Sequence, residues 1–421
     1  MKNNIPKIIL ILSCFTLIFS QSISGAIFLL IPPSPTMNGL GGIGVCLPSD
    51  DPYSGYFNPA NGLNYFEGTS YSHSKMGTPW LQSLADDLDY EVWNLGILPK
   101  KYPVKFVFSF HKTFLDLGEQ FRVDEFGNII DAFKSHMKSD ALTIGMGYTG
   151  QLKNIPFDFS FGYTRKTAIQ NFAENGKSSN ELNDYGFLFS LPFSFTKSSI
   201  KKLKPFDDAF DFDIKPSFGY SVSNIGEEIV FNDPEQADPT PKYLRIGISS
   251  TAILSYKSKW NLLEWNGGRS ASDELAEPRY NNDDPIKYQS GLGDVDFFKN
   301  VLKSKSDSLI TIHRGDEWTI LDIYIFRKGR KTDVTGKIAL HTSGYGYRLS
   351  GVFKILYYLL EDPIFEIIPE FIDVQYNYSK WEQELGHPLH DTEFESLSIS
   401  FNNLLPIPRP LYSVFTNKPL T

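Results

Sequence analysis

Cysteine is almost absent from this chain. Only Cys14 and Cys46 occur among 421 residues, and Cys14 lies in an apolar N-terminal stretch that we expect to be removed. A single remaining cysteine excludes a disulfide within the mature chain. It also excludes a zinc site built from four cysteine ligands.

Long apolar runs are missing as well. Beyond the N-terminus no run approaches the roughly 20 residues that a membrane-spanning helix requires, and the mean hydropathy is -0.23. These features exclude a bundle of transmembrane helices. They are compatible with a membrane β-barrel, because only alternate residues of its strands face lipid.

An excess of positive charge is the third feature that the sequence lacks. The net charge is -9, and lysine and arginine are scattered except for a short cluster within 201–204. Because nucleic-acid binding needs a basic face, we expect no nucleic-acid partner.

Motifs for catalysis and cofactor binding are absent too. The sequence has no Gly-x-Ser-x-Gly elbow and no phosphate-binding Walker loop. We can identify no paired serine and histidine. We therefore predict no catalytic residues, no cofactor and no enzymatic activity.

Three pairs of residues carry side chains of the kinds that bind metals. They are His387 and His390, Asp50 and Asp51, and Asp283 and Asp284. The two histidines, with Glu384 and Asp391 near, have a spacing that could touch one metal, but they lie in a predicted loop between strands. Neither aspartate pair shows a full series of calcium ligands. We predict turn or capping roles for these residues and no metal.

The first 26 residues have the pattern of an export signal. Lys2 and Lys7 precede an apolar stretch over 8–19, and Ser24-Gly25-Ala26 supplies small residues for cleavage. We expect residues 1–26 to be a cleaved signal peptide. A retained signal anchor is the alternative.

Aromatic residues are abundant and regularly spaced. The chain has 34 Phe and 22 Tyr, many of them at every second position. Within 157–163 and 185–195, Phe and Tyr alternate with Gly, Ser, Asp and similar residues. The same period of two, which is typical of strands, recurs at 104–111, 142–149, 217–223, 244–249, 372–379 and 396–401.

The chemistry of the two strand faces favours a barrel. One face is strongly aromatic, and the other carries mainly Gly, Ser, Thr, Asn and Asp. Large apolar groups facing lipid and small polar groups facing a lumen fit a transmembrane barrel. We predict an all-β fold, an antiparallel β-barrel of about 14 strands. A soluble secreted β-sandwich remains the alternative.

The pattern divides the chain into segments. We expect an N-terminal segment at 27–67, rich in Pro, Gly and Asn, a barrel at 68–402 and a Pro-rich tail at 403–421. The polar stretch 266–308, with a short helix near 296–303, and the stretch 118–139 are predicted to be extracellular loops. An inserted small soluble domain is the alternative for 266–308.

Residues 37–63 carry a resemblance to a known family. They contain Met37-Asn38-Gly39-Leu40-Gly41-Gly42, then Asp50-Asp51-Pro52, then Tyr56-Phe57-Asn58-Pro59-Ala60-Asn61-Gly62-Leu63. This resembles the opening of the PorV/PorQ family of outer-membrane proteins, relatives of the FadL-type transporters, with its "MGG", "DD" and "YYNPAGL" elements. Asn61 departs from the family, which usually has Gly or Ala there.

Two further blocks follow in the family's order. Residues 218–226, ending in Asn224-Ile225-Gly226, and residues 241–249, containing Leu244-Arg245-Ile246-Gly247, resemble mid-barrel strands of the family. A weaker third block spans 326–330 and 342–346.

The resemblance implies a FadL-like barrel with a small plug in its periplasmic mouth. The implied plug residues are Gly41, Gly42, Asp50, Asp51, Tyr56, Asn58 and Pro59. The implied barrel-motif residues are Asn224, Gly226, Leu244, Arg245 and Gly247. The glycines would permit tight turns and close approach to the barrel wall. A purely structural role at the barrel mouth is the alternative to a gating role.

Two functions are compatible with these motifs. One is passage of hydrophobic small molecules across the outer membrane, which the small polar inward faces mildly disfavour. The other is protein export of the type IX kind, with secretion machinery or cargo as partners. In either case the barrel would contact outer-membrane lipid. A surface adhesin or structural barrel stays open on the strength of the long loops.

Overall fold

The computed structural model describes most of the predicted barrel. The described residues are 24–64, 70–78, 87–97, 103–126, 128–172, 176–195, 210–256, 260–277, 285–384, 387 and 389–404. Most of the predicted signal peptide and of the Pro-rich tail therefore lies outside the described residues, as do Asp283 and Asp284.

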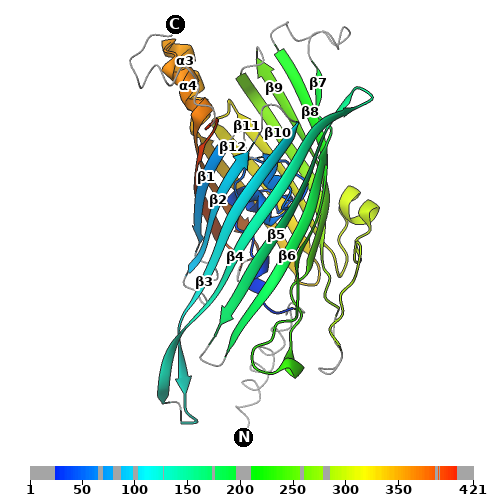
Figure 1. The fold of residues 1–421 in the computed structure, drawn as a ribbon, viewed down its shortest axis with the longest axis vertical. Helices are drawn as coiled ribbons and strands as arrows, with labels where there is room; N and C mark the ends of the chain where they lie inside the picture. The colour runs from blue at the N-terminus through cyan, green and yellow to red at the C-terminus, as the bar shows by residue number, and fades with distance from the viewer. Residues whose placement is uncertain are drawn as a thin grey trace, which may run out of the picture.

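The described strands form one antiparallel sheet that closes on itself (Figure 1). They are β1 (Ser70–Thr78), β2 (Asp87–Ile97), β3 (Val104–Val123), β4 (Ile129–Leu152), β5 (Ile155–Asn171), β6 (Lys177–Ser190), β7 (Phe193–Phe195), β8 (Phe210–Gly226), β9 (Tyr243–Tyr256), β10 (Trp260–Glu274), β11 (Thr311–Ile320), β12 (Tyr324–Asp333), β13 (Ile338–Arg348), β14 (Ile372–Glu382) and β15 (Thr392–Phe401). β1 pairs with β15, and β6 with β8, which completes the ring.

The short strand β7 occupies the same position in the ring as β6. Ser190 of β6 pairs with Ser217 of β8, and Phe193 of β7 pairs with Ile214 farther along β8. Pro192 falls between the two segments, where it can offer no N–H to the ladder. The barrel therefore has fourteen strand positions, which confirms the predicted fold class.

Side chains alternate across the barrel wall as the sequence predicts. On β15, Leu397 and Phe401 are exposed at 52% and 40%, whereas Ser396 and Ser398 are buried. The same holds on β5, where Phe159, Phe161 and Tyr163 point outward. The rings are not enclosed between two stacked sheets, so the β-sandwich alternative is wrong. An outward apolar belt around a closed barrel has the chemistry of a lipid-facing surface.

The two ends of the barrel differ. One end, called the turn end here, carries the tight turns Lys153-Asn154 and 321–323 and the end of β15. It also carries two helices that the alternating pattern did not predict, α3 (Leu349–Leu360) and α4 (Ile364–Phe371). The opposite end, called the loop end, carries the described parts 275–277 and 285–310 of the β10–β11 connection and the tip of the β3–β4 hairpin.

Two predicted loops need correction. Residues 266–274 belong to β10, where Asn266, Ser270 and Ser272 are buried on the inward face. Their polarity reflects the lumen rather than a loop. Residues 118–139 are mostly strand, because β3 continues to Val123 and β4 starts at Ile129. Cross-strand pairing of β3 with β4 continues through this hairpin to Val123 and Ile129. The predicted short helix is present as η5 (Phe297–Leu302).

No helix in the described part of the chain combines the length and the apolar character needed to cross a membrane.

The N-terminal segment 24–64 lies inside the ring of strands (Figure 1, blue). It contains η1 (Ile27–Leu30), α2 (Pro35–Gly39), η2 (Ser54–Tyr56) and η3 (Asn61–Asn64), and η4 (Pro234–Gln236) lies in the β8–β9 connection. The segment has its own buried apolar cluster of Met37, Leu40, Ile43, Leu47 and Phe57. Burial of such side chains contributes about 1.5–3 kcal/mol each, so this cluster helps to hold the segment together within the lumen.

Candidate functional site

The helix α2 starts the part of the segment that touches the barrel wall. Ser34 caps it by accepting a hydrogen bond from the Met37 N–H at 2.9 Å, and Pro35 occupies the first helical position. The Gly39 carbonyl accepts from the Thr342 hydroxyl of β13 at 2.9 Å. A short capped helix is thus fixed directly to the wall.

Gly41 and Gly42 follow α2 and pass very close to β11 and β12. Their φ angles are 66° and 93°, a region that side chains rarely tolerate. A Cβ on Gly41 would lie 2.6 Å from the Arg314 carbonyl oxygen, and one on Gly42 would lie 2.9 Å from Nδ1 of His313. Only glycine fits both the turn and the approach, which is the role that the sequence predicts.

Glycines of the wall meet this segment from the other side. A Cβ on Gly219 of β8 would lie 2.0 Å from the Val45 carbonyl oxygen, and one on Gly315 of β11 would lie 2.3 Å from that of Leu40. A Cβ on Gly162 of β5 would lie 2.2 Å from the Pro59 carbonyl carbon. The segment therefore lies against bare strand backbone on several sides of the barrel.

Asn58 and Pro59 anchor the end of the segment. The Asn58 amide donates to the carbonyls of Val45 at 2.8 Å and of Phe187 on β6 at 2.9 Å. Its side-chain oxygen accepts from the Ala60 N–H at 3.0 Å. The Asn58 side chain thus links residues 45 and 60 of the segment to strand β6 of the wall.

Asn61, the departure from the family pattern, has an internal role. Its amide donates to the carbonyls of Gly44 at 3.0 Å and Leu47 at 2.6 Å. Glycine or alanine could make neither bond. In the sequence Asn61 stands out only as a deviation from the family pattern, because these partners become neighbours only after folding.

Asp50 and Asp51 diverge rather than form a pair. Asp51 is buried and accepts from the Ser34 hydroxyl at 2.5 Å, and burial raises its pKa to about 7. Asp50 makes an ion pair with Arg348 at the end of β13. The two carboxylates face different partners and do not converge on a metal. Among the described residues, no group of three or more His, Cys, Asp or Glu side chains is placed to hold one.

His387 and His390 lie in the turn before β15. His390 contacts the Gln383 carbonyl through Nδ1 at 2.5 Å and Asp391 through Nε2 at 3.4 Å. His387 contacts the Leu389 N–H at 3.1 Å through its own Nδ1. Each ring is held within its own turn, as the predicted turn role requires.

Arg245 of the second sequence block lies against Tyr56 of the first. The Arg245 guanidinium lies 5.3 Å from the Tyr56 ring centroid and 4.6 Å from that of Tyr243. The Tyr56 hydroxyl donates to the Leu29 carbonyl at 2.9 Å. A strand motif and an N-terminal motif, far apart in sequence, thus form one contact.

The other residues of that block shape the wall behind it. Asn224 has a φ of 60°, and its amide donates to the Pro241 carbonyl at 2.8 Å. A Cβ on Gly226 would lie 2.4 Å from a backbone oxygen of β6, and one on Gly247 would lie 2.9 Å from Sγ of Cys46. Leu244 is fully buried.

The third, weaker block also meets the segment. Arg327, 1% exposed, lies 3.3 Å from where a Cβ on Gly39 would stand, and its Nε donates to Glu317 at 2.6 Å. A Cβ on Gly329 would lie 2.4 Å from the Leu40 carbonyl carbon. All three sequence blocks therefore converge on residues 37–61.

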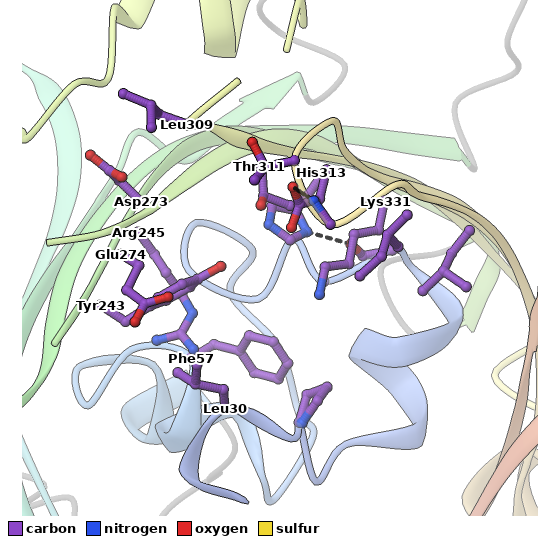
Figure 2. Close-up of a pocket in the computed structure, with 18 of the residues that line it drawn as sticks. Leu30, Phe57, Tyr243, Arg245, Asp273, Glu274, Leu309, Thr311, His313 and Lys331 are labelled. Carbon is purple, nitrogen blue, oxygen red and sulfur yellow. Dashed lines mark hydrogen bonds between the residues drawn. The ribbon is translucent and has the colours of Figure 1, made fainter. Parts of the chain in front are cut away.

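A cavity of about 450 Å³ lies beside this contact (Figure 2). Leu30, Phe57, Leu340 and Trp381 supply apolar lining, and Tyr243, Arg245, His313 and Lys331 supply polar groups. Asp273, Glu274 and Asp333 add carboxylates. Such a site can enclose a small, mainly apolar molecule and orient a polar end.

The predicted site residues divide in two. Gly41, Gly42, Tyr56 and Arg245 line this cavity, whereas Asp50, Asp51, Asn58, Pro59, Asn224, Gly226, Leu244 and Gly247 do not. Tyr243, His313 and Lys331 were missed. They sit on three different strands, and nothing in the local sequence distinguishes them from other strand residues.

Comparisons with known proteins give distant structural similarity only. The chain resembles the toluene transporter TodX of Pseudomonas putida, with a TM-score of 0.37, 9% identity, and coverage of 87% of this chain and 97% of that one. A FadL homologue of Pseudomonas aeruginosa gives a TM-score of 0.34 at 10% identity, covering 88% and 98%. The monoaromatic hydrocarbon channel CymD gives 0.33 at 10%, covering 89% and 98%. No family model matches the sequence, and no curated protein matches it. The barrel assignment rests on the strand pairing of this chain.

Proposed function

We propose that this protein is an outer-membrane channel of the PorV/PorQ and FadL-like type that passes small hydrophobic molecules, with residues 24–64 as a plug. Tight turns in such barrels are periplasmic and long loops are extracellular. The turn end, with α3, α4 and the end of β15, therefore faces the periplasm. The predicted signal peptide and the outward apolar belt agree with this location.

The cavity beside Arg245 is the observation on which the transport proposal depends. Ser308, Leu309, Thr335 and Gly336, all from the loop end, belong to its lining. A molecule arriving from outside would reach the cavity through these loops. Its lining answers the mild objection from the sequence, because Leu30 and Phe57 of the N-terminal segment add apolar surface to that of the strand residues Leu340 and Trp381.

The N-terminal segment is placed to obstruct the route onward. Gly41 and Tyr56 line the cavity, whereas Asp50 of the same segment reaches Arg348 at the turn end. The segment thus extends between the cavity and the proposed periplasmic mouth. Passage then requires the segment to shift, and we propose this gating role for the motif residues.

A disulfide tether tests the plug. The Cys46 thiol contacts the Ser249 hydroxyl of β9, and the same hydroxyl donates to the Cys46 carbonyl at 2.7 Å. Ser249→Cys, with Cys14→Ser, would cross-link the segment to the wall. We expect oxidation to abolish uptake of the apolar dye N-phenylnaphthylamine by cells and reductant to restore it.

Ser249→Ala is the matched control for this experiment, because it keeps the site small and provides no second thiol. Its uptake should not respond to oxidant. If the cross-linked protein, verified by mass, took up the dye at the uncross-linked rate, the gating role would be wrong.

A second pair of variants tests the cavity itself. Thr311 and Thr319 are both buried on the inward face of β11, but only Thr311 lines the cavity. Thr311→Trp should reduce dye uptake several-fold, whereas Thr319→Trp should leave it largely intact. Heat-modifiable gel mobility would verify that both barrels are folded. Equal uptake by the two variants would contradict a route through the cavity.

Protein export of the type IX kind is the second proposal. The connection 285–310 at the loop end exposes Phe298 at 70% and Leu309 at 58%, which suits contact with a protein. Pull-down from native membranes with wild type and with Phe298→Ser tests it. Secretion components or cargo lost by the variant, with unchanged dye uptake, would favour export. Loss of host-surface binding alone would favour an adhesin.

A further inference from the structure

The hairpin of α3 and α4 at the turn end exposes an unusual amount of apolar surface. Tyr358, Leu359 and Leu360 are exposed at 74%, 67% and 60%, and Ile364 at 45%. Across both helices only Gly351 is buried. A contiguous exposed apolar patch of this kind marks a binding surface.

The polar residues of the hairpin point the other way. Ser350, Lys354 and Tyr357 of α3 and Glu366 and Glu370 of α4 line a second cavity of about 450 Å³ at the barrel mouth. Their spacing places them on one stripe of each helix. The helices are therefore amphipathic, with the polar stripe toward the mouth and the apolar residues on the remaining faces.

Contacts with the barrel fix the hairpin in this orientation. Lys354 of α3 makes an ion pair of 2.5 Å with Asp322 in the β11–β12 turn. The rings of Phe353 and Phe365 stack between the two helices at 6.3 Å. The hairpin is thus held as a unit along the rim, and Figure 1 shows both helices together beyond the strand ends.

The apolar surface of the hairpin continues the outward belt of the barrel. Tyr347, 51% exposed on β13, precedes α3 by two residues, and Ile372, 39% exposed, starts β14 directly after α4. At the far end of α3, the Tyr358 ring meets that of Trp260 at 5.9 Å. Trp260 pairs with Tyr256, whose ring lies 5.3 Å from Phe210 in the outward aromatic face.

We propose that α3 and α4 form a membrane-surface anchor that lies in the headgroup region of the leaflet bordering the turn end. A twelve-residue helix is about 18 Å long, too short to span a bilayer but suited to its interface. The hairpin carries four acidic residues, Glu361, Asp362, Glu366 and Glu370, against Lys354. Net negative charge favours a zwitterionic lipid such as phosphatidylethanolamine over an anionic one.

Depth measurement in bilayers tests this anchor. In a Cys14→Ser/Cys46→Ser background, a nitroxide would be attached at Leu359→Cys and, as the matched control, at Glu370→Cys on the polar stripe. The full-length barrel would be reconstituted in phosphatidylethanolamine and phosphatidylcholine bilayers. Both sites are exposed, so neither change should affect folding, which gel mobility would verify.

We expect collisions with oxygen to exceed those with a water-soluble nickel complex at position 359, and the reverse at position 370. Equal access of nickel to both positions would overturn the anchor. Protection of position 359 that appears only after a periplasmic protein extract is added would also overturn it, in favour of a protein partner. The outcome does not depend on whether the barrel transports dye.

Discussion

Gly162 of β5 offers a sharp test of how the N-terminal segment is held. A Cβ at this position would lie 2.2 Å from the Pro59 carbonyl carbon and 2.5 Å from the Ala60 nitrogen. Carbon atoms in contact lie about 3.5–4.0 Å apart. In Gly162→Ala, the Pro59–Ala60 backbone must therefore retreat by roughly 1.3 Å or more.

That retreat would break the anchor made by Asn58. Its bonds of 2.8 Å to Val45 and 2.9 Å to Phe187 would stretch beyond roughly 3.6 Å, where no hydrogen bond remains. Loss of these two bonds and of the one from Ala60 costs about 0.5–1.5 kcal/mol each. We expect the segment to be destabilised by about 2–4 kcal/mol in total.

Alkylation of Cys46 measures this loss. The thiol is fully buried, burial raises its pKa to about 12, and Val45 beside it is the partner of Asn58. In a Cys14→Ser background it is the sole thiol. When a reagent reacts through local opening, labelling follows the opening equilibrium. A change of 2–4 kcal/mol raises the labelling rate roughly 30-fold to 1000-fold.

Gly147→Ala is the matched control, on the inward face of the neighbouring strand β4. There a Cβ would come no closer than 3.2 Å, to the Ser160 hydroxyl, which a small side-chain adjustment relieves. Its labelling rate should stay within a few-fold of wild type. If Gly162→Ala labelled no faster than Gly147→Ala, the reasoning that seats the segment on β5 would be refuted.

Three further changes act on other supports of the segment. Burial raises the pKa of Asp51 to about 7, so the folded protein favours the protonated carboxyl. The free energy of unfolding, measured with urea in detergent, should therefore fall between pH 4 and pH 7 by at most about 4 kcal/mol. Asp51→Asn should remove that fall. Arg327→Met leaves the Glu317 carboxylate buried without its charge partner and should lower the free energy of unfolding by about 3–5 kcal/mol in the same assay. The double variant with Glu317→Gln should recover part of that loss. An equal loss in the single and the double variant would argue against the ion pair. Asn61→Gly removes three hydrogen bonds to the segment's own backbone, at Gly44, Leu47 and Ser49. It should speed Cys46 alkylation about tenfold or more, with unchanged alkylation as the contrary result.

Strand alternation predicted most of the wall, because its physical origin is local. Each inward or outward position follows from the period of two, so residues such as Phe161 and Ser160 could be assigned to opposite faces from sequence. The same rule failed for 266–274 and 118–139. Residues 266–274 and the ends of β3 and β4 within 118–139 lack the regular aromatic face that marks the other strands. It also gave no indication of α3 and α4, whose period is different.

For the site, the sequence by itself determined which residues are unusual. Gly41, Gly42, Asn58 and Arg245 stand out as residue types that a turn, a close approach or a buried contact needs. Only the tertiary structure decided what they touch: the backbone of Arg314, the carbonyl of Phe187, the ring of Tyr56. Closure of a fourteen-strand ring brings residues hundreds of positions apart to the same lumen, and no local pattern encodes which inward side chains, such as His313 and Lys331, will share a cavity there.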